Sequence, residues 1–319
     1  MQFRRFRSAA LALVLAAGAA APAFAQRVIH LVVPFGPGAV QDTIARTFNA
    51  ELGQALGASV IVENRPGAGG TVGTGYVAKA TDNSTLVVAA ASHTLAGHLY
   101  SKLAYDPIKD FVGVAYVGNT GYVIAAPGKL GVDTLADYVK LVKSQPGKLN
   151  YASAGNGSAT HLGMAYFLAK AGLDMQHVPM KSTGDAVNEV LAGRVQGVTS
   201  SLIGVTGFKN DPRIKILAYT GAKRSKFMPD LPTVAESGVP GYKFDSWIGV
   251  LAPASLPKPE VERINAAMNK VLAMPSVQER LATLGVEPGT MSSDEFQKLL
   301  RADYEQAGVL VKASGARIE

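Results

Sequence analysis

The sequence predicts an α/β fold with more than one domain. Short runs rich in valine and isoleucine alternate with longer helical stretches, a pattern typical of strands joined by crossover helices. Several of these runs are apolar at every position, as expected of strands covered by helices on both faces. At 319 residues the chain is long for one domain and long enough for two.

The order of the expected elements supports this fold class. We expect strands at 30–35, 59–63, 86–91, 112–117, 122–126, 149–152, 198–202, 214–219 and 247–251. Between them we expect helices at 40–56, 71–79, 135–144, 158–171 and 185–192. An apolar stripe at 261–272 and a capping box formed by Ser292 and Glu295 predict two or three further helices that pack on the sheet.

The first 25 residues are typical of a secretory signal peptide. Three arginines within the first seven residues precede an apolar stretch at 9–21, and an Ala-Phe-Ala cleavage motif occupies 23–25. We therefore expect the mature chain to begin at Gln26. No apolar run reaches the roughly 20 residues that a membrane-spanning helix needs. The sequence thus predicts a periplasmic protein exported by a cleaved N-terminal signal peptide.

Composition excludes several classes of function. Hydrophobic residues make up 48% of the chain and charged residues 17%, which is typical of a folded core and not of a disordered chain. There is no cysteine, so disulfide frameworks, thiolate metal sites and cysteine nucleophiles are excluded. The net charge of +7 is not gathered into a basic cluster, which argues against nucleic-acid binding. No P-loop, dinucleotide fingerprint or metal-ligand spacing is present, so we expect no cofactor and no metal.

Three glycine-rich loops follow predicted strands and precede predicted helices. They are PFGPG at 34–38, PGAGG at 66–70 and SAGNGS at 153–158. Glycine lets the backbone approach a ligand closely, and the first turn of a helix has unpaired N–H groups and partial positive charge. Open α/β sheets bind their ligands at this end of the strands. The sequence therefore predicts an anion pocket that has these loops as its walls.

Four motifs, in order, carry a resemblance to a known family. They are PFGPGAVQDTIAR at 34–46, VENRPGAGGTVG at 62–73, YASAGNGSATHLG at 151–163, and LPTVAESGVPGY at 231–242 followed by WIGVLAPASLPKP at 247–259. Over essentially the whole mature chain the sequence resembles the Bug family, the extracytoplasmic solute-binding proteins of tripartite tricarboxylate transporters.

The resemblance implies a type II periplasmic-binding-protein fold. In this fold two α/β domains are joined by a double-crossover hinge, and the ligand cleft lies between them. We place the signal peptide at 1–25, domain I at 26–121 plus 246–319, and domain II at 122–245.

The resemblance also implies which residues hold a ligand. The expected walls are the three glycine-rich loops, the segment after the third strand, and the stretch that corresponds to the family's VPYKG together with the helix after it. The implied ligand-binding residues are Phe35, Gly36, Pro37, Gly38, Asp42, Gly69, Gly70, Ser92, His93, Ser153, Ala154, Gly155, Gly157, Ser158, His161, Lys181 and Glu189.

Some of these residues also have purely structural explanations. Asp42 lies one turn into a predicted helix, where it complements the helix dipole, and in a carboxylate pocket it would repel the ligand. We expect it to orient loop N–H groups or to meet a donor on the ligand. Ser158 can cap its helix with or without contacting the ligand. His93 and His161 are either structural or donors to a second carboxylate.

The expected function is capture of a small organic carboxylate, with a dicarboxylate or an aromatic acid favoured and no catalytic residue. The resemblance implies delivery to the membrane subunits of a tripartite tricarboxylate-type transporter, by a binding protein that we expect to be a monomer. Ligand sensing for a receptor kinase would use the same pocket and stays open as an alternative. A hydrolase built on Ser158 and His161 is disfavoured, because the sequence has no G-x-S-x-G elbow and no motif places an orienting acid.

Overall fold

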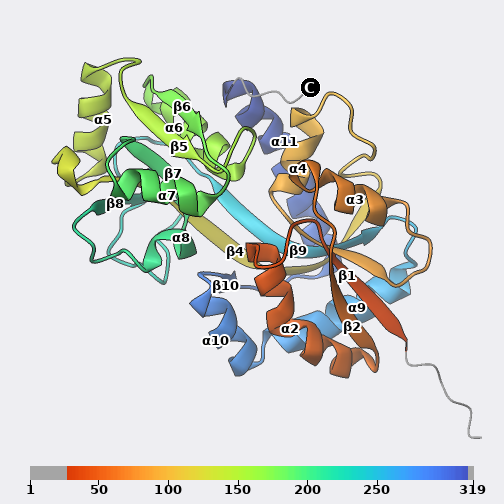
Figure 1. Cartoon of the computed structure of the whole chain (residues 1–319). Coiled ribbons are helices and arrows are strands. Elements are labelled where there is room, and N and C mark those ends of the chain that lie inside the picture. The colour runs from red at the N-terminus through yellow and green to blue at the C-terminus, as the bar shows by residue number, and fades with distance from the viewer. Residues whose placement is uncertain (1–26, 315–319) are drawn as a thin grey trace, which may run out of the picture.

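The computed structural model describes residues 27–314, so the predicted signal peptide lies outside the described residues. Figure 1 shows two α/β lobes with strands that pass between them, and this confirms the α/β class. The strands are β1 (Val28–Val33), β2 (Ser59–Asn64), β3 (Thr85–Ala90), β4 (Phe111–Pro127), β5 (Asn150–Ser153), β6 (Gln176–Pro179), β7 (Gly197–Ser201), β8 (Ile214–Tyr219), β9 (Asp245–Pro253) and β10 (Glu287–Pro288). The helices are α2 (Val40–Leu56), α3 (Thr71–Ala78), α4 (Ser92–Leu99), α5 (Leu135–Ser144), α6 (Ala159–Ala171), α7 (Thr183–Leu191), α8 (Leu202–Thr206), α9 (Lys258–Leu272), α10 (Pro275–Thr283) and α11 (Ser293–Ser314), with short 3₁₀ turns η1 (Ala68–Gly70) and η2 (Gly128–Leu130).

Parallel strands in each lobe are linked through two antiparallel strands. The sheet order within residues 27–314 is β2-β1-β3-β9-β4-β7-β5-β6, and β8 and β10 pair with β4. β1 is parallel to β2 and β3 in the first lobe, and β5 is parallel to β6 and β7 in the second. β9 and β4 run antiparallel to each other and to the strands on either side. The carboxyl ends of the parallel strands in each lobe therefore meet at one edge.

Strand β4 passes from one lobe into the other. Its residues 111–121 pair with β9, and its residues 122–127 pair with β7 and β8. The pairing partners thus change between Gly121 and Tyr122, and β9 begins at Asp245. These positions agree with the predicted division of the chain at 121/122 and 245/246, which stays a prediction.

The prediction of separate strands at 112–117 and 122–126 is wrong, because β4 is continuous. Gly118 and Gly121 lie where turn residues indicate a break, yet they pair with Ile248 and Asp245 of β9. A β carbon at Gly118 would lie 2.5 Å from the carbonyl oxygen of Glu287, and one at Gly121 would overlap the ring of Tyr219. Glycine is therefore needed for the close approach of neighbouring segments and not for a turn.

Helix ends follow the capping signals in the sequence. Helix α2 spans the predicted residues, buries Ile44, Phe48 and Leu52 completely, and ends at Gly57, which has a left-handed φ of 61°. The predicted capping box before α11 is confirmed: Glu295 N donates to Ser292 Oγ at 3.2 Å, and the Glu295 carboxylate accepts from Ser292 N at 2.8 Å.

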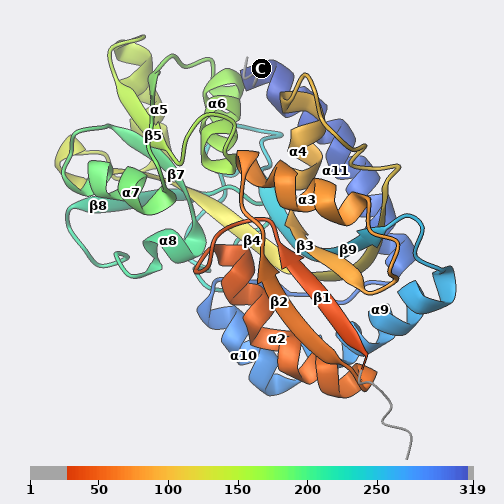
Figure 2. The same cartoon turned by 45° about the vertical axis from the view of Figure 1, so that its right-hand side comes forward.

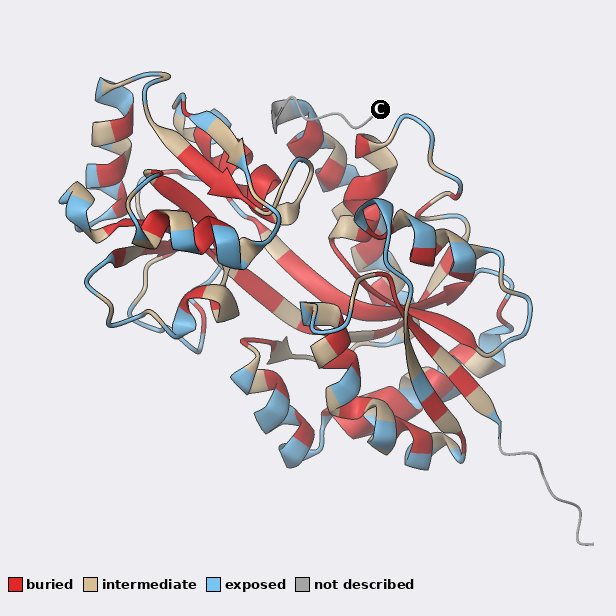
Figure 3. Ribbon diagram, viewed as in Figure 1, coloured by how far each residue is buried: buried red, intermediate tan, exposed pale blue. Residues whose placement is uncertain are grey.

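Each lobe has its own apolar core, and α11 contacts both lobes. Figure 3 shows strands that are buried along most of their length and helices that are exposed on their outer faces. Leu310 of α11 packs into the core of the second lobe. Ala307 and Val311 pack against Leu162 of α6 and against α4 of the first lobe. Figure 2 shows the C-terminal end of α11 beside α6 and α4, so this helix braces the two lobes.

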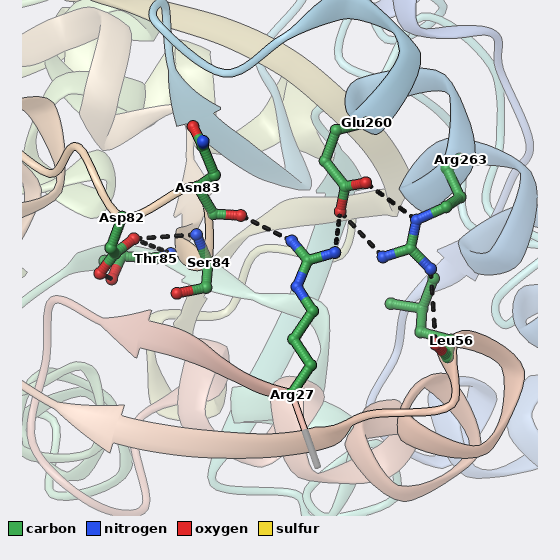
Figure 4. Close-up of polar contacts among 8 residues, drawn as sticks. All are labelled: Arg27, Leu56, Asp82, Asn83, Ser84, Thr85, Glu260 and Arg263. Carbon is green, nitrogen blue, oxygen red and sulfur yellow. Dashed lines mark hydrogen bonds and ion pairs between the residues drawn. The ribbon is translucent and has the colours of Figure 1, made fainter. Parts of the chain in front are cut away.

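A polar network secures the beginning of the described chain (Figure 4). Arg27 donates to the carbonyl oxygen of Asn83 at 2.7 Å and pairs with Glu260 at 2.7 Å. Glu260 also pairs with Arg263 at 2.9 Å, and Arg263 donates to the carbonyl oxygen of Leu56. The network thus joins the start of β1 to α2, α9 and the turn before β3.

Within residues 27–314 no helix is both long and apolar enough to cross a bilayer.

Candidate functional site

A cavity of about 410 Å³ lies between the two lobes. Loop–helix junctions from both lobes form its walls, and β4 and β9 contribute residues where they cross. The lining residues are Phe35, Val40, Gln41, Gly69, Ala90, Ser92, Ala96, Leu99, Tyr100, Thr120, Tyr122, Ala154, Asn156, Gly157, Ser158, Ala159, Thr160, Lys181, Thr183, Ser201, Ser246 and Ile248. All three predicted glycine-rich loops therefore meet in one cleft.

Seven of the predicted ligand-binding residues line this cleft. They are Phe35, Gly69, Ser92, Ala154, Gly157, Ser158 and Lys181. Gly70 and His93 line a much smaller cavity that shares Phe35, Gly69 and Ser92 with the cleft. The structure thus brings nine predicted positions to one connected region at the carboxyl ends of the strands.

The other predicted residues lie outside the cleft lining. They are Gly36, Pro37, Gly38, Asp42, Ser153, Gly155, His161 and Glu189. Glu189 departs most from the expectation, because both of its carboxylate oxygens accept hydrogen bonds at 2.6 Å from Arg194. Glu189, on α7, is thus paired with Arg194 and does not line the cleft. Several of the remaining residues shape the cleft from behind.

Asp42 organises the first loop. Its side chain is only 5% exposed, and it accepts hydrogen bonds from Gly38 N at 2.9 Å, Arg46 Nε at 3.0 Å and Asn64 Nδ2 at 2.9 Å. Burial alone would raise the pKa of this carboxyl, but the hydrogen bonds from Arg46, Gly38 and Asn64 outweigh it and lower the pKa below its ordinary value. Asp42 is therefore a carboxylate that orients a loop N–H group, the first of the two roles expected.

Ser158 caps helix α6 at the cleft. Its Oγ accepts a hydrogen bond from His161 N at 3.2 Å and lies 3.0 Å from Thr160 Oγ1, which accepts from Ala154 N at 2.8 Å. The amides of Ala159 and Thr160, in the first helical turn, have no acceptor inside the helix. These two amides and the Ser158 hydroxyl are donors that this wall can offer to an anion.

His93 is buried behind the first-lobe wall. Its Nε2 lies 2.8 Å from the carbonyl oxygen of Pro107, so this nitrogen carries the proton, and Nδ1 has no hydrogen-bond partner among the described residues. Burial lowers the pKa of His93 to about 4, and the bond to Pro107 opposes this only in part. The ring is therefore neutral at pH 7. Because its single N–H is already used, His93 is not a donor to a carboxylate in this arrangement.

The two walls of the cleft differ in polarity. The lining contains one charged residue, Lys181, and no acidic side chain. Its non-aromatic hydrocarbon side chains larger than alanine are Val40, Leu99 and Ile248, and these come from the first lobe together with Phe35. The second lobe supplies Lys181 and most of the hydroxyl groups. The cleft therefore suits a molecule with one anionic end and an apolar body.

Sequence reasoning predicted Ser92 at the start of α4 but missed the residues contributed by the crossing strands, by the rest of α4 and by Tyr100 directly after it. Thr120 Oγ1 donates to the carbonyl oxygen of Ser246 at 3.2 Å, which ties β4 to β9 at the cleft. The hydroxyl of Tyr100 donates to the carbonyl oxygen of Ala68 at 2.9 Å and thereby supports the second glycine-rich loop. In the sequence, Thr120 belongs to a Gly-Asn-Thr-Gly stretch between two apolar runs, and Ser246 follows Asp245 directly before the apolar residues of β9. In addition, no group of three or more His, Cys, Asp and Glu side chains in residues 27–314 is placed to hold a metal ion.

Two α/β lobes joined by crossing strands, with a cleft of loop–helix junctions between them, define a two-domain solute-binding protein. The chain belongs to the tripartite tricarboxylate transporter receptor family: the family model TctC, described as "Tripartite tricarboxylate transporter family receptor", matches residues 44–316. The resemblance found in the sequence motifs is thereby confirmed.

Individual relatives agree with this assignment. The chain is 31% identical over 313 residues to Protein BugT of Bordetella pertussis, across 96% of each protein. It is similar to the structure of Rpa4515 of R. palustris with adipate, with a TM-score of 0.82 and 30% identity over 92% of this chain and 100% of that one. MatC of Rhodopseudomonas palustris with bound malate gives a TM-score of 0.78 and 31% identity over 90% of this chain and 100% of that one. The predicted two-domain periplasmic-binding-protein fold is confirmed.

Proposed function

We propose that this protein captures a small organic carboxylate in the cleft between its lobes and delivers it to the membrane subunits of a tripartite tricarboxylate-type transporter. It acts in the periplasm as a monomer, after removal of its signal peptide, and leaves the ligand chemically unchanged. The observation that carries the proposal is a cleft with one cation, Lys181, and no acid in its lining. Family membership and the adipate and malate complexes of relatives support it.

Hinge closure supplies the mechanism. The carboxylate is received by the Ser158 hydroxyl, the first-turn amides of α6 and the Lys181 ammonium, which replace part of its hydration shell. The apolar body contacts Phe35, Leu99 and Ile248 of the opposite wall. Ligand that touches both walls stabilises the closed arrangement over the open one, because only the closed arrangement offers both sets of contacts. The membrane subunits then recognise the closed form.

A panel of acids with matched neutral amides tests this proposal. Adipate, malate and benzoate are compared with adipamide, malamide and benzamide in thermal unfolding of the mature protein. A ligand present at about 100 times its Kd adds roughly 2.7 kcal/mol to the free energy of unfolding, which corresponds to a rise in Tm of about 5 °C. At least one acid should raise Tm, and its amide should not. Equal shifts by each acid and its amide, or no shift with any of the three acids, contradict the proposal.

Replacing Ser158 by alanine should weaken carboxylate binding about tenfold, because one hydrogen bond to a charged group is lost. The variant also loses a helix cap worth about 1 kcal/mol of stability. Thr134→Ala is the matched control, since Thr134 caps α5 by accepting from Asp137 N at 3.1 Å and does not line the cleft. Isothermal titration calorimetry with the acid that binds best measures both variants. If the two variants bind the acid with similar affinity, Ser158 does not contact the ligand.

A further inference from the structure

Two histidine rings stack beneath the glycine-rich loop of the second lobe. The centroids of His161 on α6 and His177 on β6 are 3.9 Å apart, and their planes differ by 10°. The ring of Tyr151 on β5 lies nearly parallel to both imidazoles, with its centroid 5.0 Å from that of His177 and 6.3 Å from that of His161. Neither histidine lines the cleft, but the loop directly above them does, through Ala154, Asn156, Gly157 and Ser158.

Each ring is tied to one of the glycines that turn this loop. Gly157 N donates to His161 Nδ1 at 3.1 Å. His177 Nε2 lies 2.6 Å from Ser153 Oγ, and the same oxygen accepts from Gly155 N at 3.1 Å. Gly155 and Gly157 have φ angles of 110° and 73°, a region that favours glycine. Two imidazole contacts therefore help to hold the loop, together with hydrogen bonds from Ala154 N to Thr160 Oγ1 and from Ser158 N to the carbonyl oxygen of Gly155.

The contact with Gly157 requires a neutral His161. Because Nδ1 accepts a hydrogen bond, the proton of this ring sits on Nε2. Protonation of Nδ1 would set one N–H group against another and remove the acceptor. A second positive charge on the stacked His177 would add repulsion. Burial, and then the charge of His177, lower the pKa of His161 to about 4, and burial lowers the pKa of His177.

Three carboxylates on neighbouring helices have hydrogen-bond or ion-pair partners other than the two histidines. Burial raises the pKa of Tyr151 to about 12, so its ring is uncharged. On α7, which packs against β5, Asp185 accepts a hydrogen bond from Ser182 Oγ, and Glu189 is paired with Arg194. On α11, which packs against α6, Asp303 accepts from Trp247 Nε1. None of these carboxylates has a hydrogen bond or ion pair to either histidine ring among residues 27–314.

We propose that His161 and His177 are positioning residues of the cleft: as a neutral stacked pair they hold the loop at 153–158 in its ligand-facing shape, and protonation of the pair releases that loop. If the proposed function holds, carboxylate affinity falls as the pair is protonated. An imidazolium charge near the cleft would act in the opposite direction and strengthen the binding of an anion. The sign of the pH effect therefore separates loop positioning from simple charge attraction.

The first test uses ligand-free protein and does not depend on the proposed function. The ¹⁵N–¹H resonances of Gly157 and Gly155 are followed from pH 7.5 down to the lowest pH at which near-ultraviolet circular dichroism shows an intact fold. In the wild type both resonances should move together with the imidazole signals of His161. In His161→Asn the amide oxygen can replace Nδ1 as an acceptor that does not titrate, so the Gly157 resonance should no longer follow pH. Ser153→Ala is the control for the contact between His177 and Ser153. It should shift the resonance of Gly155, while the resonance of Gly157 still changes with pH.

A Gly157 resonance that is insensitive to pH in the wild type, or that titrates equally in His161→Asn, overturns the proposal. The second test uses adipate as the probe at pH 7.5. We expect His161→Ala to weaken adipate binding about tenfold and His161→Asn to remain within about threefold of the wild type. Equal losses in both variants contradict positioning by a neutral acceptor. If adipate binds neither variant nor the wild type, the proposed carboxylate ligand is in doubt, and the resonance titration still decides the role of the histidines.

Discussion

Between pH 7.5 and pH 5 the folded protein should lose about 2 kcal/mol of unfolding free energy because of His93 alone. The pKa of this ring is about 4 in the folded chain, against an ordinary value of 6.5. As pH falls below 6.5 the unfolded chain takes up a proton that the folded chain does not, so unfolding becomes more favourable. The contribution is fully present above pH 6.5 and is lost progressively until pH falls through 4.

The variant His93→Gln isolates this effect. Its side-chain amide can donate to the carbonyl of Pro107 as Nε2 does, but it does not titrate. Urea unfolding at pH 7.5 and pH 5 should show a smaller pH-dependent loss in the variant than in the wild type, by about 2 kcal/mol. Phe111→Leu alters packing against the same ring, whose centroid lies 4.8 Å from that of Phe111, and removes no titratable group. The Phe111→Leu variant should keep the wild-type pH dependence of the unfolding free energy. If His93→Gln also keeps the full wild-type pH dependence, protonation of His93 is not its cause.

The histidines of the second lobe change stability in the same direction. The pKa values of His161 and His177 are both lowered by burial, so protonation also favours unfolding there. Protonation of His161 and His177 lowers the free energy of unfolding, as protonation of His93 does, but it acts at a different place in the molecule. His93 lies behind the first-lobe wall, whereas His161 and His177 support a loop of the second lobe. Acid therefore weakens both walls of the cleft.

Sequence patterns predicted the regular elements better than the crossing strands. The helices at 40–56 and 135–144 were predicted with the observed limits, because Gly57 ends the first and a Thr134–Asp137 capping box begins the second. Two elements, β6 and α4, were not predicted, because their sequences show no clear periodicity. β6 has only four residues, and five of the eight residues of α4 are buried. The break predicted within β4 failed because its glycines serve close packing against Tyr219 and Glu287. Such packing partners are distant in the sequence and cannot be identified from local composition.

The candidate site was predicted at the level of loops and less well at the level of side chains. Loops that follow parallel strands converge whatever their side chains, so Phe35, Gly69 and Ser158 reached one cleft. Which side chains point inward depends on partners elsewhere in the chain. Glu189 is paired with Arg194 and does not line the cleft, whereas no acidic side chain in that lining neutralises Lys181. The stacking of His161 on His177 likewise depends on the pairing of β5 with β6, which no motif indicated.

Asp42→Ala should destabilise the protein by about 3 kcal/mol and weaken carboxylate binding about tenfold. The change leaves three donors without their acceptor: Gly38 N, Arg46 Nε and Asn64 Nδ2. Asn64 also donates to the carbonyl oxygen of Phe35 at 3.0 Å, so its reorientation would move a residue of the cleft wall. Stability and affinity should therefore fall together, although Asp42 does not line the cleft.

Asp185→Ala is the matched control, because Asp185 also lies in the first turn of a helix but at an exposed position, where it accepts a hydrogen bond from Ser182. Loss of an exposed acid of this kind costs about 0.5–1 kcal/mol. Urea unfolding and calorimetric titration with the best-binding acid measure both variants. If Asp42→Ala costs no more than Asp185→Ala, the buried carboxylate is not what shapes the loop. If stability falls and affinity does not, Asp42 holds the loop at 34–38, but that loop is not a wall of the site. A ligand in contact with the loop would bind more weakly once the loop was no longer held in place.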